Sequence, residues 1–203
     1  MRWLSGSSQQ EGIGMFFYRE FFSLLLLGFA FPAYSALADS VNGIDELVHS
    51  ITVKVDEYEF IQREITYTHT TIPGIGQPSN TITGWFQQEV SDYFNEYPVL
   101  IENVYHHAGV TSSERYFFLP DGQLVYCSSS FDNGHEENPG DIKIFYFVEG
   151  VPANYRETPE ATLDSLNSEL LEMAGERKSQ AEYLMWMFQN MYVPATCIFD
   201  EGW

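Results

Sequence analysis

The sequence predicts an α+β fold with an N-terminal helix, an antiparallel β-meander of five to six strands and a long C-terminal helix. Three observations predict it. Runs rich in aromatic and β-branched residues recur through the middle of the chain, separated by turn residues. Apolar residues at helical spacing lie on both sides of this region. At its centre, Leu119-Pro-Asp-Gly-Gln123 joins two such runs, and this turn sequence is typical of a β-hairpin.

The N-terminal segment has the pattern of a secretory signal peptide. An apolar run covers residues 21–31, Arg19 precedes it, and Ala36-Leu-Ala38 offers a small-residue cleavage site. We expect cleavage after Ala38, which divides the chain into a signal peptide (residues 1–38) and a single α+β domain (residues 39–203). The mature domain would then be periplasmic or extracellular. The run falls short of the roughly 20 residues of a spanning helix, so no transmembrane anchor is expected after cleavage.

The start of the chain leaves one alternative open. Met15 begins a compact positively charged segment before the apolar run, and Met1 begins a longer one. Both are compatible with a signal peptide, so the sequence does not choose between them.

The composition is strongly acidic. Lys and Arg together number 9 against 29 Asp and Glu, which gives a formal net charge of −20 at pH 7. Such a surface repels nucleic acid and anionic lipid, whereas it favours solubility, cations and basic proteins. Hydrophobic residues make up 44% of the chain, which predicts a folded core and excludes a mainly disordered protein.

The elements follow from local patterns. An N-terminal helix is expected over residues 43–62, with Asn42 and Asp45 as a capping pair. The C-terminal helix is expected to begin at the cap Thr158, with Pro159 in its first turn, and to end before Pro194. Between them, strands are expected over residues 65–69, 81–87, 99–106, 115–119, 124–127 and 142–148.

Two of the expected strands are apolar at nearly every position. These are residues 115–119 and 142–148. A sheet with one face in water would instead alternate apolar and polar residues. The pattern therefore predicts that both faces are covered, one by a helix and the other by the second helix, a loop or a partner.

The central hairpin also carries a resemblance. The stretch Tyr116-Phe-Phe-Leu-Pro-Asp-Gly-Gln-Leu-Val-Tyr126, with the order of elements around it, resembles a loosely defined group of exported bacterial proteins with aromatic β-meanders. The resemblance covers about residues 43–155. It implies the meander fold and carries over no catalytic residue.

Aromatic residues are unusually frequent, at 16% of the chain. Two interpretations remain open: they fill a large core, or some of them line an apolar groove on the sheet for a glycan, a lipid fragment or a peptide. The groove candidates are Trp85, Tyr116, Tyr126 and Tyr146.

Calcium is the one metal that the sequence favours as a candidate. The acidic loop at residues 131–141 supplies hard oxygen ligands, with Asp132, Glu136 and Asp141 as the candidate set. The loop lacks the spacing of an EF-hand. Zinc is disfavoured, because adjacent His106 and His107 on a strand would point to opposite faces. No other cofactor is expected.

The chain has two cysteines, and both follow the expected cleavage site. Cys127 ends the second strand of the central hairpin, and Cys197 lies in a short apolar tail after the C-terminal helix. An oxidising compartment permits pairing. If the helix packs on the sheet, its tail returns to the sheet edge, so a Cys127–Cys197 disulfide is predicted.

Paired carboxylates are the main alternative to a binding role. Glu102 and Glu114 lie on neighbouring expected strands, and a glycosidase needs two carboxyl groups across a cleft. A second acidic group is close in sequence: Glu89, Asp92 and Glu96. In so acidic a chain, however, some carboxylates fall near one another by chance.

The leading hypothesis is an exported, non-catalytic acidic module that binds a ligand or partner, whether a protein, a glycan or a small molecule. One alternative is a hydrolase of envelope polymers that uses paired carboxylates. The other is a structural envelope protein.

Overall fold

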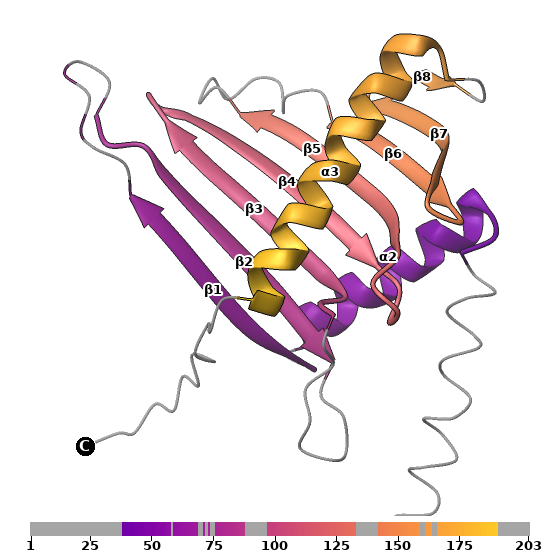
Figure 1. The fold of residues 1–203 in the computed structure, drawn as a ribbon, viewed down its shortest axis with the longest axis horizontal. Coiled ribbons are helices and arrows are strands. Elements are labelled where there is room, and N and C mark those ends of the chain that lie inside the picture. The colour runs from indigo at the N-terminus through magenta and orange to yellow at the C-terminus, as the bar shows by residue number, and fades with distance from the viewer. Residues whose placement is uncertain are drawn as a thin grey trace, which may run out of the picture. The chain divides into compact units, whose positions relative to one another are not determined.

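In the computed structural model, all described residues belong to the unit Leu37–Trp203, and their fold is drawn in Figure 1. The expected signal peptide lies outside the described residues except for Ala38, so its cleavage stays a prediction. The structure describes residues 38–57, 59–68, 71, 73, 76–87, 97–132, 142–158, 161–163 and 166–190.

One antiparallel sheet forms the centre of this unit. Its strands lie side by side in their sequence order, and every neighbouring pair is antiparallel. The predicted meander is confirmed, but the described strands exceed the expected five to six: seven have at least seven residues, and a three-residue eighth follows. They are β1 (Phe60–Thr68), β2 (Ser79–Gln87), β3 (Leu100–His107), β4 (Val110–Phe118), β5 (Leu124–Asp132), β6 (Ile142–Val148), β7 (Val151–Thr158) and β8 (Ala161–Leu163).

The predicted central hairpin is confirmed between β4 and β5. Gly122 takes a φ of 86°, and its N–H donates to Leu119 O at 2.9 Å. Asp121 Oδ1 accepts a hydrogen bond from Gln123 N at 3.0 Å. The glycine therefore supplies the left-handed backbone, and the aspartate holds the turn from its own side chain.

Two further hairpins use two-residue turns with positive φ at both positions. Ala108 and Gly109 have φ values of 53° and 79°, and Glu149 and Gly150 have 51° and 73°. Mirror-image turns of this kind match the twist of antiparallel strands. These turns connect β3 directly to β4 and β6 directly to β7.

The N-terminal helix, α2 (Val41–Asp56), is shorter than expected. Its cap is Ser40, whose Oγ accepts from Gly43 N at 3.2 Å, and not the expected pair Asn42 and Asp45. It ends before residue 62 because Ile61 lies in β1 opposite Phe86. Pairing with β2 satisfies backbone groups there, and this long-range gain overrides the local helical spacing.

The C-terminal helix, α3 (Ser168–Asn190), begins later than expected. Thr158 does not cap it but ends β7, where its Oγ1 accepts from Ile142 N at 3.3 Å. Asn167 is the actual cap, and its Oδ1 accepts from Leu170 N at 2.9 Å. Thr158 stays in β7 because β7 pairs with the edge of β6, whose backbone would otherwise lack partners. Ala161–Leu163, expected in the first turns of the helix, forms β8 against β7.

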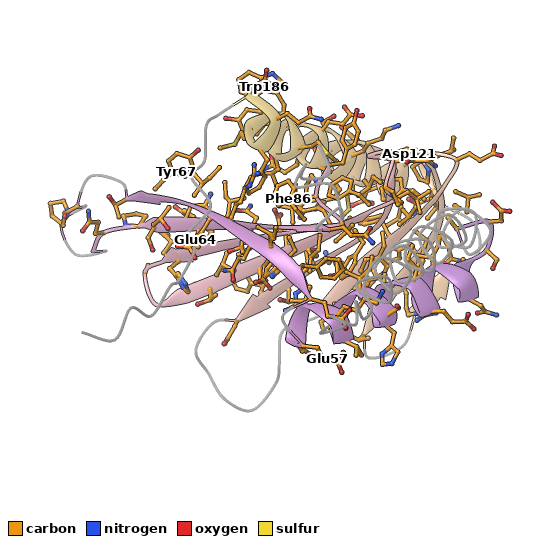
Figure 2. All side chains as sticks on the ribbon, turned by 90° about the horizontal axis from the view of Figure 1, so that it is seen from below. Glu57, Glu64, Tyr67, Phe86, Asp121 and Trp186 are labelled. Carbon is orange, nitrogen blue, oxygen red and sulfur yellow. The ribbon has the colours of Figure 1, made fainter. Side chains whose placement is uncertain are left out.

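The two helices lie on opposite faces of the sheet, as Figure 2 shows. The prediction that both faces are covered is thus confirmed. Directly paired residues form rows across the sheet, and alternate rows face opposite sides. The row on the α3 side is Gly84, Ile101, Tyr116, Cys127, Phe145 and Tyr155; the adjacent row on the α2 side is Trp85, Leu100, Phe117, Tyr126, Tyr146 and Asn154.

The α3 side packs closely. A Cβ added to Gly84 would lie 2.9 Å from Phe188 Cζ, a distance that real Cβ atoms do not occupy. The helix therefore sits directly on the backbone of β2. All buried residues of α3 are apolar, and they are Leu170, Ala174, Ala181, Leu184, Met185, Met187 and Phe188.

Candidate ligand pocket

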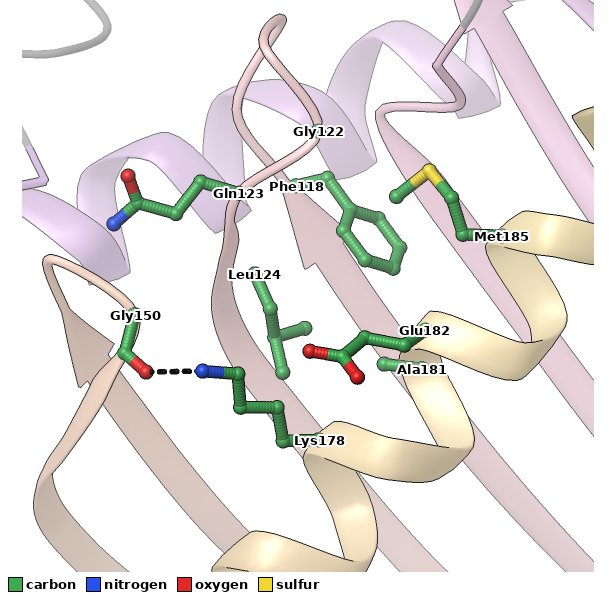
Figure 3. Close-up of a pocket in the computed structure, with 9 residues that line it drawn as sticks. All are labelled: Phe118, Gly122, Gln123, Leu124, Gly150, Lys178, Ala181, Glu182 and Met185. Carbon is green, nitrogen blue, oxygen red and sulfur yellow. Dashed lines mark hydrogen bonds between the residues drawn. The ribbon is translucent and has the colours of Figure 1, made fainter.

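A pocket of about 220 Å³ opens between α3 and the two hairpin turns β4–β5 and β6–β7 (Figure 3). Its floor is apolar and comes from three elements: Phe118 of β4, Leu124 of β5, and Ala181 with Met185 of α3. All four side chains are buried. The helical spacing of Ala181 and Met185 places both on the same face of α3, above the hairpin.

Glycine is required at the hairpin edge of this pocket. Gly122 has positive φ, and a Cβ there would lie 2.7 Å from Tyr97 Cδ1. Both the backbone conformation and the close ring exclude a side chain. A side chain at this position would strain the turn and push against the Tyr97 ring.

Hydrogen bonds tie the rim of the pocket together. Lys178 Nζ of α3 donates to Gly150 O at 2.8 Å, which Figure 3 marks. With its amide oxygen turned toward the β6–β7 turn, Gln123 accepts from Glu149 N at 3.2 Å and from Gly150 N at 2.8 Å. The two turns and the helix thus hold one another, so the pocket is preformed.

The polar groups of the rim carry opposite charges. Lys178 and Glu182 are four residues apart in α3 and both line the pocket. Residues at this spacing share a helix face. The rim therefore presents an ammonium and a carboxylate beside an apolar floor, a combination that can bind and orient a small polar molecule.

A partly buried ionic network joins α3 to the sheet next to this pocket. Arg177 of α3 donates to Glu114 Oε1, while Glu114 Oε2 accepts from Asn103 Nδ2 at 3.1 Å and from Tyr116 OH at 2.9 Å. Burial opposes the charge of Arg177, but the neighbouring Glu114 carboxylate leaves the Arg177 pKa raised. The network sets the rotation of the helix, and so the position of the adjacent Lys178.

Burial also raises the pKa values of Tyr116 and Cys127, which lie beneath this network. It raises the pKa of Tyr116, and the Glu114 charge and hydrogen bond add to the effect. Burial likewise raises the pKa of the Cys127 thiol, to about 12. Both side chains therefore stay protonated at neutral pH and act as core residues.

The four aromatic residues expected to line a groove do not share a face. Trp85, Tyr126 and Tyr146 lie in one row on the α2 side, whereas Tyr116 lies beneath α3. The rings of Tyr126 and Tyr146 pack edge to face, with their centroids 5.4 Å apart. Tyr116 and Tyr146 are fully buried. For these two residues the structure therefore agrees with the other interpretation, in which the aromatic residues fill the core.

The expected calcium ligands cannot be compared as a set. Asp132 is exposed at the end of β5, and Glu136 and Asp141 lie outside the described residues. Within the residues that the structure describes, no three His, Cys, Asp or Glu side chains gather as a metal site. The calcium site stays a prediction.

The remaining expected pairs have different outcomes. Glu102 and Glu114 lie on opposite faces of the sheet, because Glu102 pairs with Arg115 and Glu114 with Asn103. These two carboxylates therefore do not face one another. The other acidic candidates (Glu89, Asp92 and Glu96) and Cys197 lie outside the described residues, so the disulfide stays a prediction.

Sequence reasoning did not identify the pocket residues. Gln123 was assigned only to the turn, and Lys178 and Glu182 only to the length of the C-terminal helix. The one local signal is the spacing of Lys178 and Glu182, which is equally typical of a solvent-exposed helix face. Their meeting with the β6–β7 turn depends on how α3 packs.

The chain matches no protein-family model, no curated protein and no solved structure. The resemblance to exported proteins with aromatic meanders therefore stays a prediction. Of the helices that the structure describes, none is both long enough and apolar enough to cross a membrane.

Proposed function

We propose that the protein is an exported, non-catalytic acidic module that binds a small ligand in the pocket beside α3. One observation carries the proposal: the pocket combines a buried apolar floor with a charged rim in which Lys178 is already tied to Gly150 O. Concave sites of this composition are the usual ligand sites of proteins. A rim that needs no rearrangement lowers the entropic cost of binding.

The size of the pocket limits the ligand. Its volume of about 220 Å³ lies below the roughly 300 Å³ at which sites for drug-sized molecules begin. A compact metabolite fits this volume, and a polymer would engage it with one terminal unit only. Export is supported by the sequence pattern that ends at Ala38.

The test is a thermal-shift screen of the purified full-length protein against amino acids, short fatty acids, monosaccharides and dipeptides. A ligand that binds only the folded state raises the melting temperature with concentration. We expect at least one class to do so, and Ala181→Met, which fills the floor, to abolish the shift. Ala153→Met, at an exposed position of β7, is the matched control.

Two results would overturn the proposal. One is the lack of any stabilising compound in the four classes. The other is a shift that persists unchanged in Ala181→Met. If this variant does not fold, Lys178→Met alters the rim without adding volume to the floor and takes its place.

Export has its own test. N-terminal sequencing of protein recovered from the native host should begin at Asp39. A chain that begins at Met1 or Met15 would contradict export and leave the pocket proposal standing.

A further inference from the structure

We propose that the pocket takes a small zwitterion with an apolar side group, namely a free aliphatic α-amino acid. This inference rests on the proposed function and names its ligand class. The ammonium of Lys178 would receive the ligand carboxylate, the carboxylate of Glu182 would receive the ligand ammonium, and the apolar floor would receive the side chain.

The ammonium of Lys178 can donate more hydrogen bonds than it does in the described structure. Its ammonium can donate three hydrogen bonds, and the described structure gives it one acceptor, the neutral Gly150 O. Arg115, Arg156 and Arg177 each face a carboxylate of the chain, whereas the hydrogen bond of Lys178 goes to a backbone carbonyl. Lys178 is therefore a cation at the rim that a ligand carboxylate can complement.

Glu182 supplies the opposite charge on the same helix face. In the described structure its carboxylate does not come within ion-pair distance of Lys178 Nζ, although the two side chains extend over the same pocket (Figure 3). The two charges therefore do not neutralise each other in the described structure. A ligand with both charges on neighbouring atoms can bind between them.

The floor selects the rest of the ligand. Phe118, Leu124 and Met185 are buried aliphatic or aromatic surfaces with no charge. Contact with an aliphatic side chain removes apolar area from water on both partners. A polar or charged side chain would lose its hydration there without gaining hydrogen bonds.

The charge of the whole protein also favours a zwitterion over a simple carboxylate. At a net charge of −20, the protein repels a monoanion at low ionic strength. A zwitterion is neutral overall and approaches without this penalty. Once bound, it still offers a carboxylate to Lys178.

The test is calorimetric titration of the full-length protein with L-leucine and two analogues that each lack one charge. These are 4-methylpentanoate, which lacks the ammonium, and 3-methylbutylamine, which lacks the carboxylate. We expect leucine to bind and each analogue to bind about tenfold more weakly or worse, since each loses a charge-assisted hydrogen bond.

The variants assign the two charges to residues. Lys178→Met and Glu182→Gln should each weaken leucine binding by about tenfold. Lys178→Arg keeps both a cation and N–H donors for Gly150 O, so it should retain leucine binding within about threefold as the conservative rescue. Lys54→Met on α2 and Glu176→Gln at an exposed position of α3 are the matched controls and should bind as the unaltered protein does.

Two results would overturn the inference: binding of 4-methylpentanoate as tight as that of leucine, or leucine binding unaffected by Glu182→Gln. If leucine fails but another compound gives a thermal shift that Ala181→Met abolishes, only the ligand class is wrong. If no compound gives such a shift, the proposed function is wrong as well.

Discussion

The two sides of the sheet carry the same three kinds of side chain in different surroundings. On the α3 side, Glu114 accepts from Tyr116 and from Arg177 of the helix. On the α2 side, Asp45 of the helix accepts from Tyr146 at 2.7 Å and pairs with Arg156 at 3.4 Å. A tyrosine hydroxyl, a carboxylate and a guanidinium thus join each helix to the sheet.

Burial separates the two networks. The side chain of Glu114 is 14% exposed and that of Arg177 is 31% exposed, against 38% for Asp45 and 36% for Arg156. Water screens the outer pair, so its contribution to stability is small. The two arginines are exposed to nearly the same extent, so the lower exposure of the Glu114 carboxylate is what makes the inner pair less screened by water and more costly to break. Identical chemistry therefore contributes differently to the attachment of the two helices.

The close approach of α3 to the backbone is the basis of this deeper burial. Gly84→Val should separate Phe188 from β2 and lower the free energy of unfolding by about 2–3 kcal/mol, in the range of overpacked cores. For a protein of this size the melting temperature would fall by about 5–10 °C. Denaturant unfolding and calorimetry measure both quantities.

Gly175→Ala on α3 is the control for that substitution. Nothing lies within 4 Å of the added Cβ, and alanine favours the helix by about 1 kcal/mol over glycine. It should therefore stabilise the protein. Equal behaviour of the two variants would show that α3 does not rest on Gly84.

The ion pairs themselves provide the next largest effect. Glu114→Gln should destabilise the protein by about 1–3 kcal/mol, because Arg177 keeps its charge without a carboxylate. Asp45→Asn should cost at most about 1 kcal/mol, as expected for a solvent-screened pair. Urea unfolding at pH 7 compares them, and a larger loss for Asp45→Asn would reverse the assignment of the inner and outer networks.

Alkaline titration tests the two tyrosines. Burial raises the folded-state pKa of Tyr116 and of Tyr146, and their carboxylate partners add to the shift. Above about pH 10 the unfolded chain loses these protons while the folded protein keeps them, so stability falls as pH rises, by up to about 1.4 kcal/mol per pH unit for each group. Tyr116→Phe and Tyr146→Phe should each flatten this slope in urea unfolding between pH 9.5 and 11.

A slope that neither substitution changes would contradict the burial of both hydroxyls. At pH 7, Tyr116→Phe and Tyr146→Phe should each lower the free energy of unfolding by about 0.5–1.5 kcal/mol, because each removes one hydrogen bond.

The smallest effect concerns a rate and not stability. With its pKa raised to about 12 by burial, Cys127 has a thiolate fraction of about 10⁻⁴ at pH 8. In the reduced protein, alkylation of Cys127 in the native state should be slower than in denaturant by about a thousandfold, as followed by mass spectrometry. Rapid native labelling would show that α3 opens readily.

The same measurement bears on the predicted disulfide. Cys127 lies beneath α3 and Cys197 lies outside the described residues, so thiol titration decides whether the two pair. If they pair, unreduced protein from the native host should show no titratable thiol in denaturant. Two titratable thiols would exclude the bond.

Local residue patterns were sufficient for the order of helix, antiparallel meander and helix, but not for the number of strands. Pro120, Asp121 and Gly122 predicted the central hairpin because their backbone preferences are intrinsic to each residue. The apolar strands around Phe117 and Phe145 predicted a sheet covered on both faces, since such runs cannot face water. These properties depend on a residue and its near neighbours, so they follow from the sequence.

Tertiary structure decided where elements end and where the pocket lies. Ile61 leaves the helical pattern to pair with β2, and Thr158 ends a strand that completes β6. Likewise, Tyr116 faces α3 while Tyr126 faces α2, and Lys178 meets Gly150 across 28 positions of the chain. Each outcome depends on strand register or helix rotation. These are fixed by contacts between distant segments, which local propensity does not encode.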